Sequence, residues 1–490
     1  MTNFLLALLT AVLLILAFPR FDLTFLAAVG LVPLLVAARR ERLMWRRFLM
    51  GELAGVVYWF GVTYWIQSVL EVYGGMGRAG SWGAFLLFAV LKAVHMGVFT
   101  ALAGYLMPTP YAIPAVAALW VAIERTHGPL GFAWLALGDA GTDMGVPMRM
   151  APLAGVYGVS FVFAMMSVAV ALVLMRRPRR ELAWVVALPC LYLLPALPEP
   201  QRGVESAVVV QPNFSEAEHW STQSVEAAEQ NLFRLSMGSA LRADEPAARM
   251  MLWPEMPLPL YYEEDPRFRE QAAALARSAR TSLLFGAVAH TSGHAPLNSA
   301  ILLDAGGNFA GRYDKMFLVP FGEYVPPLFS FVNRITTEAG DFVPGDKLVV
   351  MPVDGRRTGV FICYESAFPY LVRQFTASGA EVLVNLSNDG YFGASAAREQ
   401  HLKLVRMRAA ENRRWLVRAT NSGISATIDP AGRVAHRLPE YAQTAVRTRY
   451  SYQTGLTPYA RYGDWFVWVC AAMALAGLTA TQVPKYRRES

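Results

Sequence analysis

Three side chains of reactive type stand beside short apolar runs in the middle of the chain. Glu255 directly follows residues 251–254, Lys315 lies in the segment 311–323, and Cys363 ends the apolar run 360–363. A carboxylate, an ammonium and a thiol are groups that nucleophilic catalysis combines. Each alone has a plainer interpretation, because a thiol that ends an apolar strand usually belongs to the core and a loop carboxylate is usually solvated.

Lysine usage makes Lys315 the more informative of the three. Segment 201–460 contains 26 basic residues, and only Lys315, Lys347 and Lys403 are lysines. Arginine fills almost every other basic position, so a compact ammonium is a candidate requirement at residue 315. Cys363 is the only cysteine of this segment, which leaves an inert buried residue or a reactive thiol as alternatives.

Short apolar runs alternate with helical patterns from about residue 203, which is typical of an α/β domain. We predict one catalytic domain over residues 203–450, long enough for a single core. Side chains at strand ends in such folds converge on one site. The expected strands are 207–210, 250–253, 283–289, 300–303, 348–351, 360–363, 382–386 and 416–420, and the expected helices are 224–242, 267–280, 370–378 and 396–413.

The remaining parts of the chain are too apolar for a wholly soluble protein. Of 490 residues, 54% are hydrophobic and 17% are charged, against about a quarter charged in soluble domains. We predict a multi-pass bundle of about eight transmembrane helices, seven within residues 1–200 and one in the segment 461–490 with its cytoplasmic tail. The apolar runs are 4–18, 25–38, 49–69, 82–107, 111–123, 157–175, 182–197 and 465–481.

The charge distribution predicts an orientation. Segment 201–460 has 26 basic and 26 acidic residues, so the net charge of +7 belongs to the hydrophobic parts, which argues against a nucleic-acid partner. Basic residues collect at 39–47, 176–180 and 485–488, on one side of the predicted bundle. The positive-inside rule then puts both termini in the cytoplasm and the catalytic domain outside.

The order of Glu255, Lys315 and Cys363 resembles the Glu-Lys-Cys triad of the nitrilase, or carbon–nitrogen hydrolase, superfamily. The surrounding sequence resembles its membrane branch, the apolipoprotein N-acyltransferases, and with the eight predicted spans this resemblance covers the whole chain. It implies an αββα sandwich for the catalytic domain. The matching segments are LVPFGEYVP at 318–326, NLSND at 385–389, QH at 400–401, RMRA at 406–409 and RATNSG at 418–423.

The resemblance implies acyl transfer from a membrane phospholipid to the α-amino group of the diacylglyceryl-cysteine of an apolipoprotein. Cys363 would carry the acyl group as a thioester, with Glu255 as general base. Lys315 and the backbone N–H of Tyr364 would stabilise the oxyanion. The expected donor is phosphatidylethanolamine. The expected location is the bacterial inner membrane, with the catalytic domain in the periplasm.

Five further residues are assigned by the same resemblance. Glu323 and Glu365 are expected to orient Lys315 and the approaching amine. Trp220 is expected near the lipid entrance, with a surface tryptophan as the alternative. Asn388 and Tyr391 lie in a loop that reads NDGYFG over 388–393. The family commonly reads Asn-Asp-Ala-Trp-Phe-Gly there, so this chain departs from it but retains an aromatic residue.

Two other classes of function compete with this interpretation. The first is a membrane-bound amidase or nitrilase that hydrolyses a small amide with the same triad. The eight predicted spans argue against it, because a single span is enough to tether an enzyme to a membrane. The second is a transporter or channel, for which the expected internal repeats are missing. No metal-ligand spacing is found, so we expect no metal and no cofactor, and nothing requires more than a monomer. Ionisable residues inside the predicted spans are expected to pair between helices, with a functional role as the alternative: Glu52, Lys92, His95 and Glu124.

Overall fold

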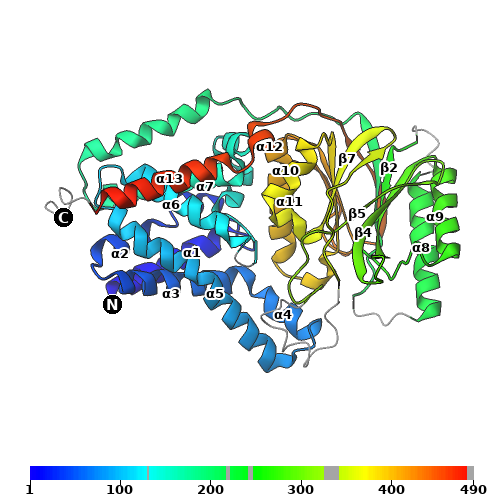
Figure 1. Cartoon of the computed structure of the whole chain (residues 1–490), viewed down its shortest axis with the longest axis horizontal. Coiled ribbons are helices and arrows are strands. Elements are labelled where there is room, and N and C mark those ends of the chain that lie inside the picture. The colour runs from blue at the N-terminus through cyan, green and yellow to red at the C-terminus, as the bar shows by residue number, and fades with distance from the viewer. Residues whose placement is uncertain (130–131, 217–220, 241–246, 325–341, 483–490) are drawn as a thin grey trace. The chain divides into compact units, whose positions relative to one another are not determined.

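The computed structural model of the chain describes residues 1–129, 132–216, 221–240, 247–324 and 342–482, which form two compact units (Figure 1). The first unit comprises residues 1–68, 77–197 and 457–490 and is helical in its described parts. The second comprises residues 69–76 and 198–456 and contains the twelve described strands. A helical region and a separate α/β domain, as predicted, are therefore confirmed.

The helical unit contains two helices that are long and apolar enough to cross a bilayer, as judged over the described residues. They are Gly77–Leu106 and Pro147–Leu174, and a pair bent by 60°, Met44–Thr63 with Trp65–Val72, would make a third. The other apolar runs form shorter elements, so two to three spans are supported where eight are predicted. The helix bounds are Thr2–Ala17 (α1), Val32–Arg40 (α2), Met44–Thr63 (α3), Trp65–Val72 (α4), Gly77–Leu106 (α5), Ala112–Glu124 (α6), Ala151–Leu174 (α7), Pro458–Tyr462 (α12) and Trp465–Ala480 (α13).

The seventh predicted span, over 182–197, is not an α-helix. Residues Arg179–Ala187 and Pro189–Leu193 form two 3-10 helices instead. Pro189 has no N–H to donate and its ring would clash with the carbonyl group four residues earlier, so an α-helix cannot run through this position undisturbed.

A buried polar cluster lies inside the helical unit. The Lys92 ammonium contacts His127 Nδ1 and donates to the carbonyl oxygen of Phe132 at 2.8 Å. It also lies 4.7 Å from the centre of the Trp59 ring. His95 stacks on His127 with ring centres 4.0 Å apart. For Lys92, the predicted pairing between helical elements is confirmed.

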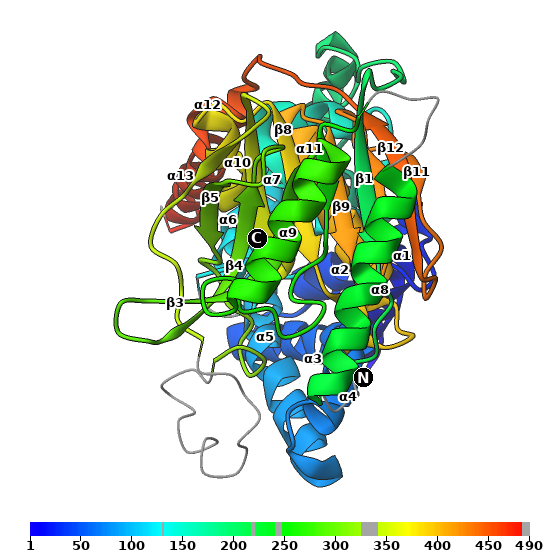
Figure 2. The ribbon, with the colours of Figure 1, turned by 90° about the vertical axis from the view of Figure 1, so that its right-hand side faces the viewer.

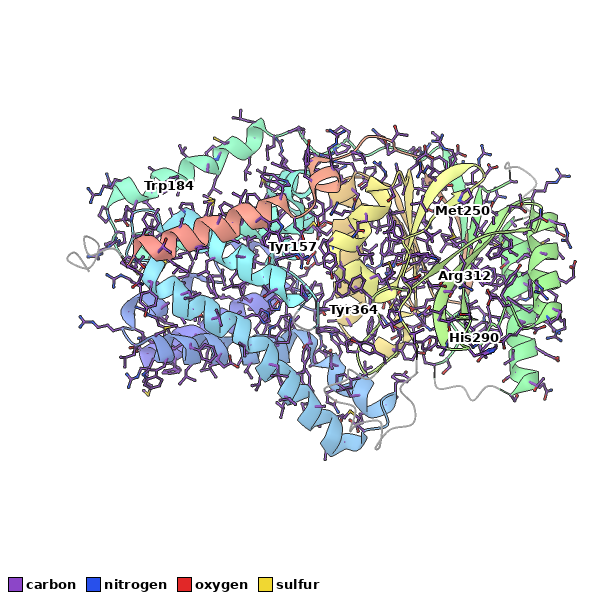
Figure 3. All side chains as sticks on the ribbon, in the orientation of Figure 1. Tyr157, Trp184, Met250, His290, Arg312 and Tyr364 are labelled. Atoms are coloured by element: carbon purple, nitrogen blue, oxygen red, sulfur yellow. The ribbon has the colours of Figure 1, made fainter. Side chains whose placement is uncertain are left out.

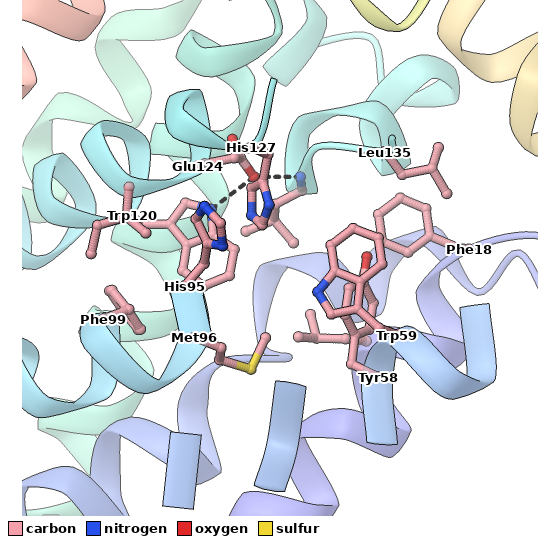
Figure 4. A pocket seen from close by; sticks show the side chains of 13 residues that line it. Phe18, Tyr58, Trp59, His95, Met96, Phe99, Trp120, Glu124, His127 and Leu135 are labelled. Atoms are coloured by element: carbon pink, nitrogen blue, oxygen red, sulfur yellow. Dashed lines mark hydrogen bonds between the residues drawn. The ribbon is translucent and has the colours of Figure 1, made fainter. Parts of the chain in front are cut away.

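Glu124 lines a small pocket beside this cluster (Figure 4). Its Oε1 atom accepts hydrogen bonds from Trp120 Nε1 at 3.0 Å and from the backbone N–H of Leu137 at 2.7 Å. Through Leu137 and the Ser160 side chain, Glu124 joins α6 to neighbouring helical elements, as predicted. Glu52 forms no ion pair within the described ranges, so the prediction is not met there.

The second unit is built on two six-stranded sheets. The first has the order β12-β1-β2-β3-β4-β5 and the second the order β11-β10-β9-β8-β7-β6. The first six bounds are Glu205–Gln211 (β1), Met250–Leu252 (β2), Ser282–His290 (β3), Pro296–Leu303 (β4), Phe309–Asp314 (β5) and Val350–Val353 (β6). The others are Arg356–Ile362 (β7), Val382–Ser387 (β8), Leu416–Thr420 (β9), Ala426–Ile428 (β10), Val434–Arg437 (β11) and Thr444–Tyr450 (β12).

Strand direction decides which residues meet. In the first sheet β1, β2 and β3 are parallel. Strand β5 also runs in this direction, because it is antiparallel to β4, which is antiparallel to β3. In the second sheet β7, β8 and β9 are parallel. Each sheet therefore brings the residues that follow its parallel strands to one edge.

Helices cover the outer faces of both sheets, which gives the αββα layering implied by the resemblance (Figures 1 and 2). The first sheet is covered by Thr222–Ala240 (α8) and Pro266–Ala279 (α9), and the second by Pro369–Ala377 (α10) and Ala397–Asn412 (α11). Apolar side chains of β1, β2 and β3 pack against α8 and α9 in one buried cluster. Side chains fill the interior of the unit between these layers (Figure 3).

Candidate active site

Most residues of the candidate site immediately follow a strand, as the α/β pattern predicts. Glu255 comes three residues after β2, Lys315 directly follows β5, and Cys363 directly follows β7. Asn388 and Asn421 directly follow β8 and β9. Two edges, one from each sheet, thus supply the side chains described below.

Lys315 lies between two carboxylates and is 1% exposed. Its Nζ atom is 2.9 Å from Glu255 Oε1 and 2.9 Å from Glu323 Oε2. Asn298 at the start of β4 joins the same carboxylates, since its Nδ2 donates to Glu255 Oε1 at 2.8 Å and to Glu323 Oε1 at 2.6 Å. The backbone N–H of Asn388 donates to Glu255 Oε2 at 2.9 Å. Both oxygens of Glu255 are therefore held in place.

Cys363 has a backbone φ of 50°, in the left-handed region that non-glycine residues rarely adopt. This turn begins the 3-10 helix Cys363–Ala367 and ends β7. The thiol is buried, forms a hydrogen bond with the side chain of Ser387, and feels the charges of Glu255 and Lys315. Conformational strain at a reactive residue is common in active sites.

Glu365 fixes the turn at Cys363 relative to the segment that carries Lys315. One oxygen accepts from the Tyr313 hydroxyl at 2.7 Å and from the backbone N–H of Met316 at 2.7 Å. The other accepts from the backbone N–H of Ile362 at 2.7 Å. The carboxyl is fully buried. Glu365 thus contacts backbone and a phenol, and forms no described hydrogen bond with Lys315, which it was expected to orient.

Helix α11 supports the same turn through His401, whose Nε2 donates to the carbonyl oxygen of Cys363 at 3.1 Å. Arg418 Nη2 lies 3.1 Å from His401 Nδ1 and 2.7 Å from Asp389 Oδ2. The same Nδ1 atom lies 2.9 Å from Asp389 Oδ1, so Asp389 and Arg418 both contact one side of the imidazole while Nε2 on the other side holds the Cys363 carbonyl group. All three of these supporting side chains are fully buried.

The electrostatics of the site follow from burial and from one shared cation. Burial raises the pKa of the Cys363 thiol, the Glu255 charge adds to this, and Lys315 opposes it. For Lys315, burial would lower the pKa, but the charges of Glu255 and Glu323 outweigh it, so the pKa is raised and the ammonium stays charged. Burial raises the pKa of Glu365 to about 7.

Three further residues predicted from the sequence are Tyr364, Tyr391 and Trp220. Tyr364 is buried and packs edge-on against Phe368, with ring centres 5.0 Å apart. Tyr391 is 44% exposed, and its ring meets Tyr73 with centres 5.0 Å apart. Trp220 lies outside the described residues.

A further carboxyl group, near Glu255 and Tyr391, was not predicted from the sequence. Glu216 lies five residues after β1, and its Oε1 accepts from Asn421 Nδ2 at 2.6 Å. It also forms hydrogen bonds with the side chains of Asn388 and Tyr391, and the Glu255 charge acts on it. The signal that could have found it is its place after the first strand of the parallel set.

Asn298, His401 and Tyr313 were also not among the predicted site residues. Asn298 is 1% exposed although it is an amide at the start of an otherwise apolar strand. His401 and Tyr313 both lie in segments already quoted for other reasons. For Asn298, the available signal was an amide inside a largely apolar strand. Tyr313 and His401 gave no such signal, because β5 is mostly half-exposed and α11 is rich in charged residues.

Comparison with known proteins agrees with this domain architecture. Residues 207–456 match the description of a carbon–nitrogen hydrolase, so the second unit is a domain of the nitrilase class. Residues 10–169 match the N-terminal domain of apolipoprotein N-acyltransferase. The chain belongs to the apolipoprotein N-acyltransferase family.

Individual relatives match along nearly the full length. The apolipoprotein N-acyltransferase of Geobacter metallireducens is 31% identical, covering 100% of this chain and 96% of its own. That of Nitrosomonas europaea is 30% identical, covering 94% and 93%. Among solved structures, a variant of an amidase of the nitrilase superfamily from Nesterenkonia is 19% identical, covers 56% of this chain and 98% of its own, and gives a TM-score of 0.40.

Proposed function

We propose that this chain transfers a fatty acyl group from a membrane phospholipid to the free α-amino group of the N-terminal diacylglyceryl-cysteine of apolipoproteins, the last step of lipoprotein maturation. The observation that carries the proposal is the full-length similarity to apolipoprotein N-acyltransferases, over the helical unit as well as the domain. The clustering of Glu255, Lys315 and Cys363 supports the mechanism.

In the first half-reaction, the Cys363 sulfur attacks the carbonyl carbon of the phospholipid ester. Because burial raises the pKa of this thiol, a base must remove its proton as the attack occurs, and Glu255 is the carboxylate near it. Lys315, with the backbone N–H of Tyr364, stabilises the oxyanion. The C–O bond then breaks, the lysophospholipid oxygen takes the proton from Glu255, and the acyl group stays on sulfur.

In the second half-reaction, the acceptor amine attacks the thioester carbonyl. The C–N bond forms, the C–S bond breaks, and Glu255 passes the proton from the amine to the departing sulfur. Glu323 holds Lys315 in place throughout, and Glu365 holds the nucleophile turn. We assign Asn388 and Tyr391 to contact with the substrates, and Trp220 to contact with the entering lipid.

Both substrates carry acyl chains that leave a bilayer only at about 0.8 kcal/mol per exposed CH₂, which favours a site at the membrane surface. We assign residues 1–200 to a bundle of about seven spans, 203–450 to a periplasmic catalytic domain, and 461–490 to a final span and tail. We further assign the protein to the inner membrane as a monomer with both termini in the cytoplasm. Phosphatidylethanolamine is the assigned acyl donor.

The proposal is tested with purified full-length protein, phosphatidylethanolamine labelled in its acyl chain, and a diacylated lipopeptide. We expect lysophospholipid release, a hydroxylamine-sensitive label on the protein, and label on the peptide amine. Cys363→Ala is expected to abolish all three, and Cys190→Ala, at an exposed free cysteine, to leave them unchanged.

A labelled Cys363→Ala protein would overturn the choice of nucleophile. If the wild-type protein hydrolyses a small amide and forms no peptide amide, the chain is instead a membrane-bound amidase that uses the same residues. This second candidate is favoured only by the similarity of the domain to carbon–nitrogen hydrolases.

A further inference from the structure

Glu216 is a carboxyl group at the candidate site that the two half-reactions leave without a task. It is partly exposed, and the segment that carries it is clamped by Asn421, whose side chain bonds to both backbone groups of Phe214. The same Asn421 amide donates to Glu216 Oε1 at 2.6 Å. The carboxyl is therefore held at a defined place, with part of its surface open.

The other carboxylates of the site are already committed to partners. Glu255 and Glu323 share the Lys315 ammonium. Asp389 pairs with Arg418, and Glu365 is saturated by Tyr313 and backbone N–H groups. Within the described part of the chain, Glu216 has no cationic partner, and its bonds come from the neutral groups of Asn421, Asn388 and Tyr391.

The proposed reaction brings a cation to this site. An N-terminal α-amino group has a pKa of about 7.7–8.0, so at pH 7 the acceptor arrives mainly as an ammonium, which has no lone pair to attack with. We propose that Glu216 is the subsite that binds this α-ammonium and removes its first proton. This inference rests on the proposed function, because it concerns the second half-reaction only.

The proton balance is simple. The Glu216 carboxylate takes one proton from the ammonium, which leaves a neutral amine beside the thioester. The amine nitrogen attacks, the C–N bond forms and the C–S bond breaks. Glu255 takes the second proton from nitrogen and returns it to the Cys363 sulfur. Glu216 then releases its proton to solvent.

The surroundings suit a carboxyl that exchanges a proton near neutral pH. Burial and the neighbouring Glu255 charge raise the Glu216 pKa, the bonds from Asn421, Asn388 and Tyr391 oppose this, and the net result is a pKa of about 7. Among the described residues Tyr73 also faces this region; its own pKa is raised by burial and by Glu216 and is lowered by Arg398. A carboxyl with a pKa close to that of its proton donor transfers the proton at little cost.

The test is the variant Glu216→Gln, in which the side-chain oxygen can still accept from Asn421. We expect lysophospholipid release and thioester formation at the wild-type rate. Transfer to the diacylated lipopeptide at pH 7 is expected to fall about tenfold in kcat/KM, the effect of one lost charge-assisted hydrogen bond. The deficit is expected to shrink toward pH 9, where the acceptor is already a free amine.

Hydroxylamine, which is uncharged at neutral pH, serves as a second acceptor. We expect Glu216→Gln to release the acyl group to hydroxylamine as fast as wild type does. Glu226→Gln, on the outer face of α8 where Glu226 pairs with Arg267, is the matched control and is expected to match wild type throughout.

Equal slowing with both acceptors, slowed thioester formation, or no effect at any pH would each overturn the assignment of Glu216. These results differ from failure of the proposed function itself. In that case the wild-type protein would form no lipopeptide amide under any condition.

Discussion

At the scale of single residues, the site depends on one lysine that neutralises two buried carboxylates. Replacing Lys315 by Met would leave Glu255 and Glu323 without their cation, and breaking one partner of a buried pair costs about 3–5 kcal/mol. We expect Lys315→Met to lose lysophospholipid release and to unfold at a clearly lower temperature in detergent. Lys347→Met, at an exposed lysine, should change neither.

An unchanged unfolding temperature in Lys315→Met would contradict this prediction. It would mean that Glu255 and Glu323 are protonated or hydrated when the cation is absent. A double variant separates these effects. Lys315→Met with Glu323→Gln removes one of the two orphaned charges, and we expect it to recover part of the lost stability but none of the activity.

Glu216 also gives a prediction that needs no substrate. Its pKa is about 7 in the folded protein and about 4.3 when unfolded. Between these values the folded state keeps a proton that the unfolded state has released, so this group makes stability fall as pH rises from about 4.5 to 7. The loss is about 4 kcal/mol at most. We expect the free energy of unfolding of Glu216→Gln to rise relative to that of wild type over this range, in unfolding curves measured from pH 4.5 to 8. If the difference between the two free energies of unfolding stayed constant with pH, the raised pKa of Glu216 would be contradicted.

Some site residues could be predicted and others could not, for a physical reason. Glu255, Lys315 and Cys363 are charged or reactive types next to apolar runs, which a single sequence makes visible. Asn298 carries no charge and lies in a strand, so only the contacts of its amide with two carboxylates reveal it. Glu216 is one of many carboxylates in loops, and its burial depends on Asn421, 205 residues away.

At the scale of elements, the strand β3 must let the Glu255 segment pass close by. A Cβ atom on Gly286 would lie 2.6 Å from the backbone N of Met256 and 2.7 Å from Glu255 Cα. Backbone atoms cannot move aside cheaply, so we expect Gly286→Ala to shift Glu255, to lower acyl-enzyme formation by at least tenfold, and to destabilise the domain by about 1–3 kcal/mol.

The matched control is Gly238→Ala in α8, where an added Cβ meets nothing within 4 Å. Alanine is favoured over glycine inside a helix by about 0.5–1 kcal/mol, so this variant should be as stable as wild type or slightly more stable. If Gly286→Ala formed the acyl-enzyme at the wild-type rate, the turn at Glu255 would tolerate displacement, and the prediction would be wrong.

Elements with strong apolar patterns were predicted well, and those at sheet margins were not. The predicted strand 416–420 coincides with β9, and each of the other seven predicted strands overlaps an observed one. Strands β5, β11 and β12 were missed because most of their side chains are half-buried or exposed and their sequences alternate weakly, as in VAHR over 434–437. The short β10 was missed although it is buried.

At the scale of the whole molecule, the predicted orientation is open to direct measurement. In a background without reactive thiols (Cys190→Ala, Cys363→Ser, Cys470→Ala), we would introduce Ala305→Cys or Arg42→Cys, both at exposed positions. A membrane-impermeant maleimide should label residue 305 in intact spheroplasts, and residue 42 only after lysis, because the basic loop is expected in the cytoplasm. The reverse pattern would invert the topology.

The pairing of β1 with β12 has a consequence for the making of the protein. The first strand of the domain forms seven register pairs with the last one, so residues 444–450 must be synthesised before that edge is covered. Arg418 and Asn421, which support the nucleophile turn and the Glu216 segment, also come late. A chain that ends before residue 418 therefore leaves β1 as an unpaired strand edge and lacks the side chains that support the nucleophile turn. We expect such a fragment to form no acyl-enzyme, so acylation at the membrane is coupled to completion of the chain.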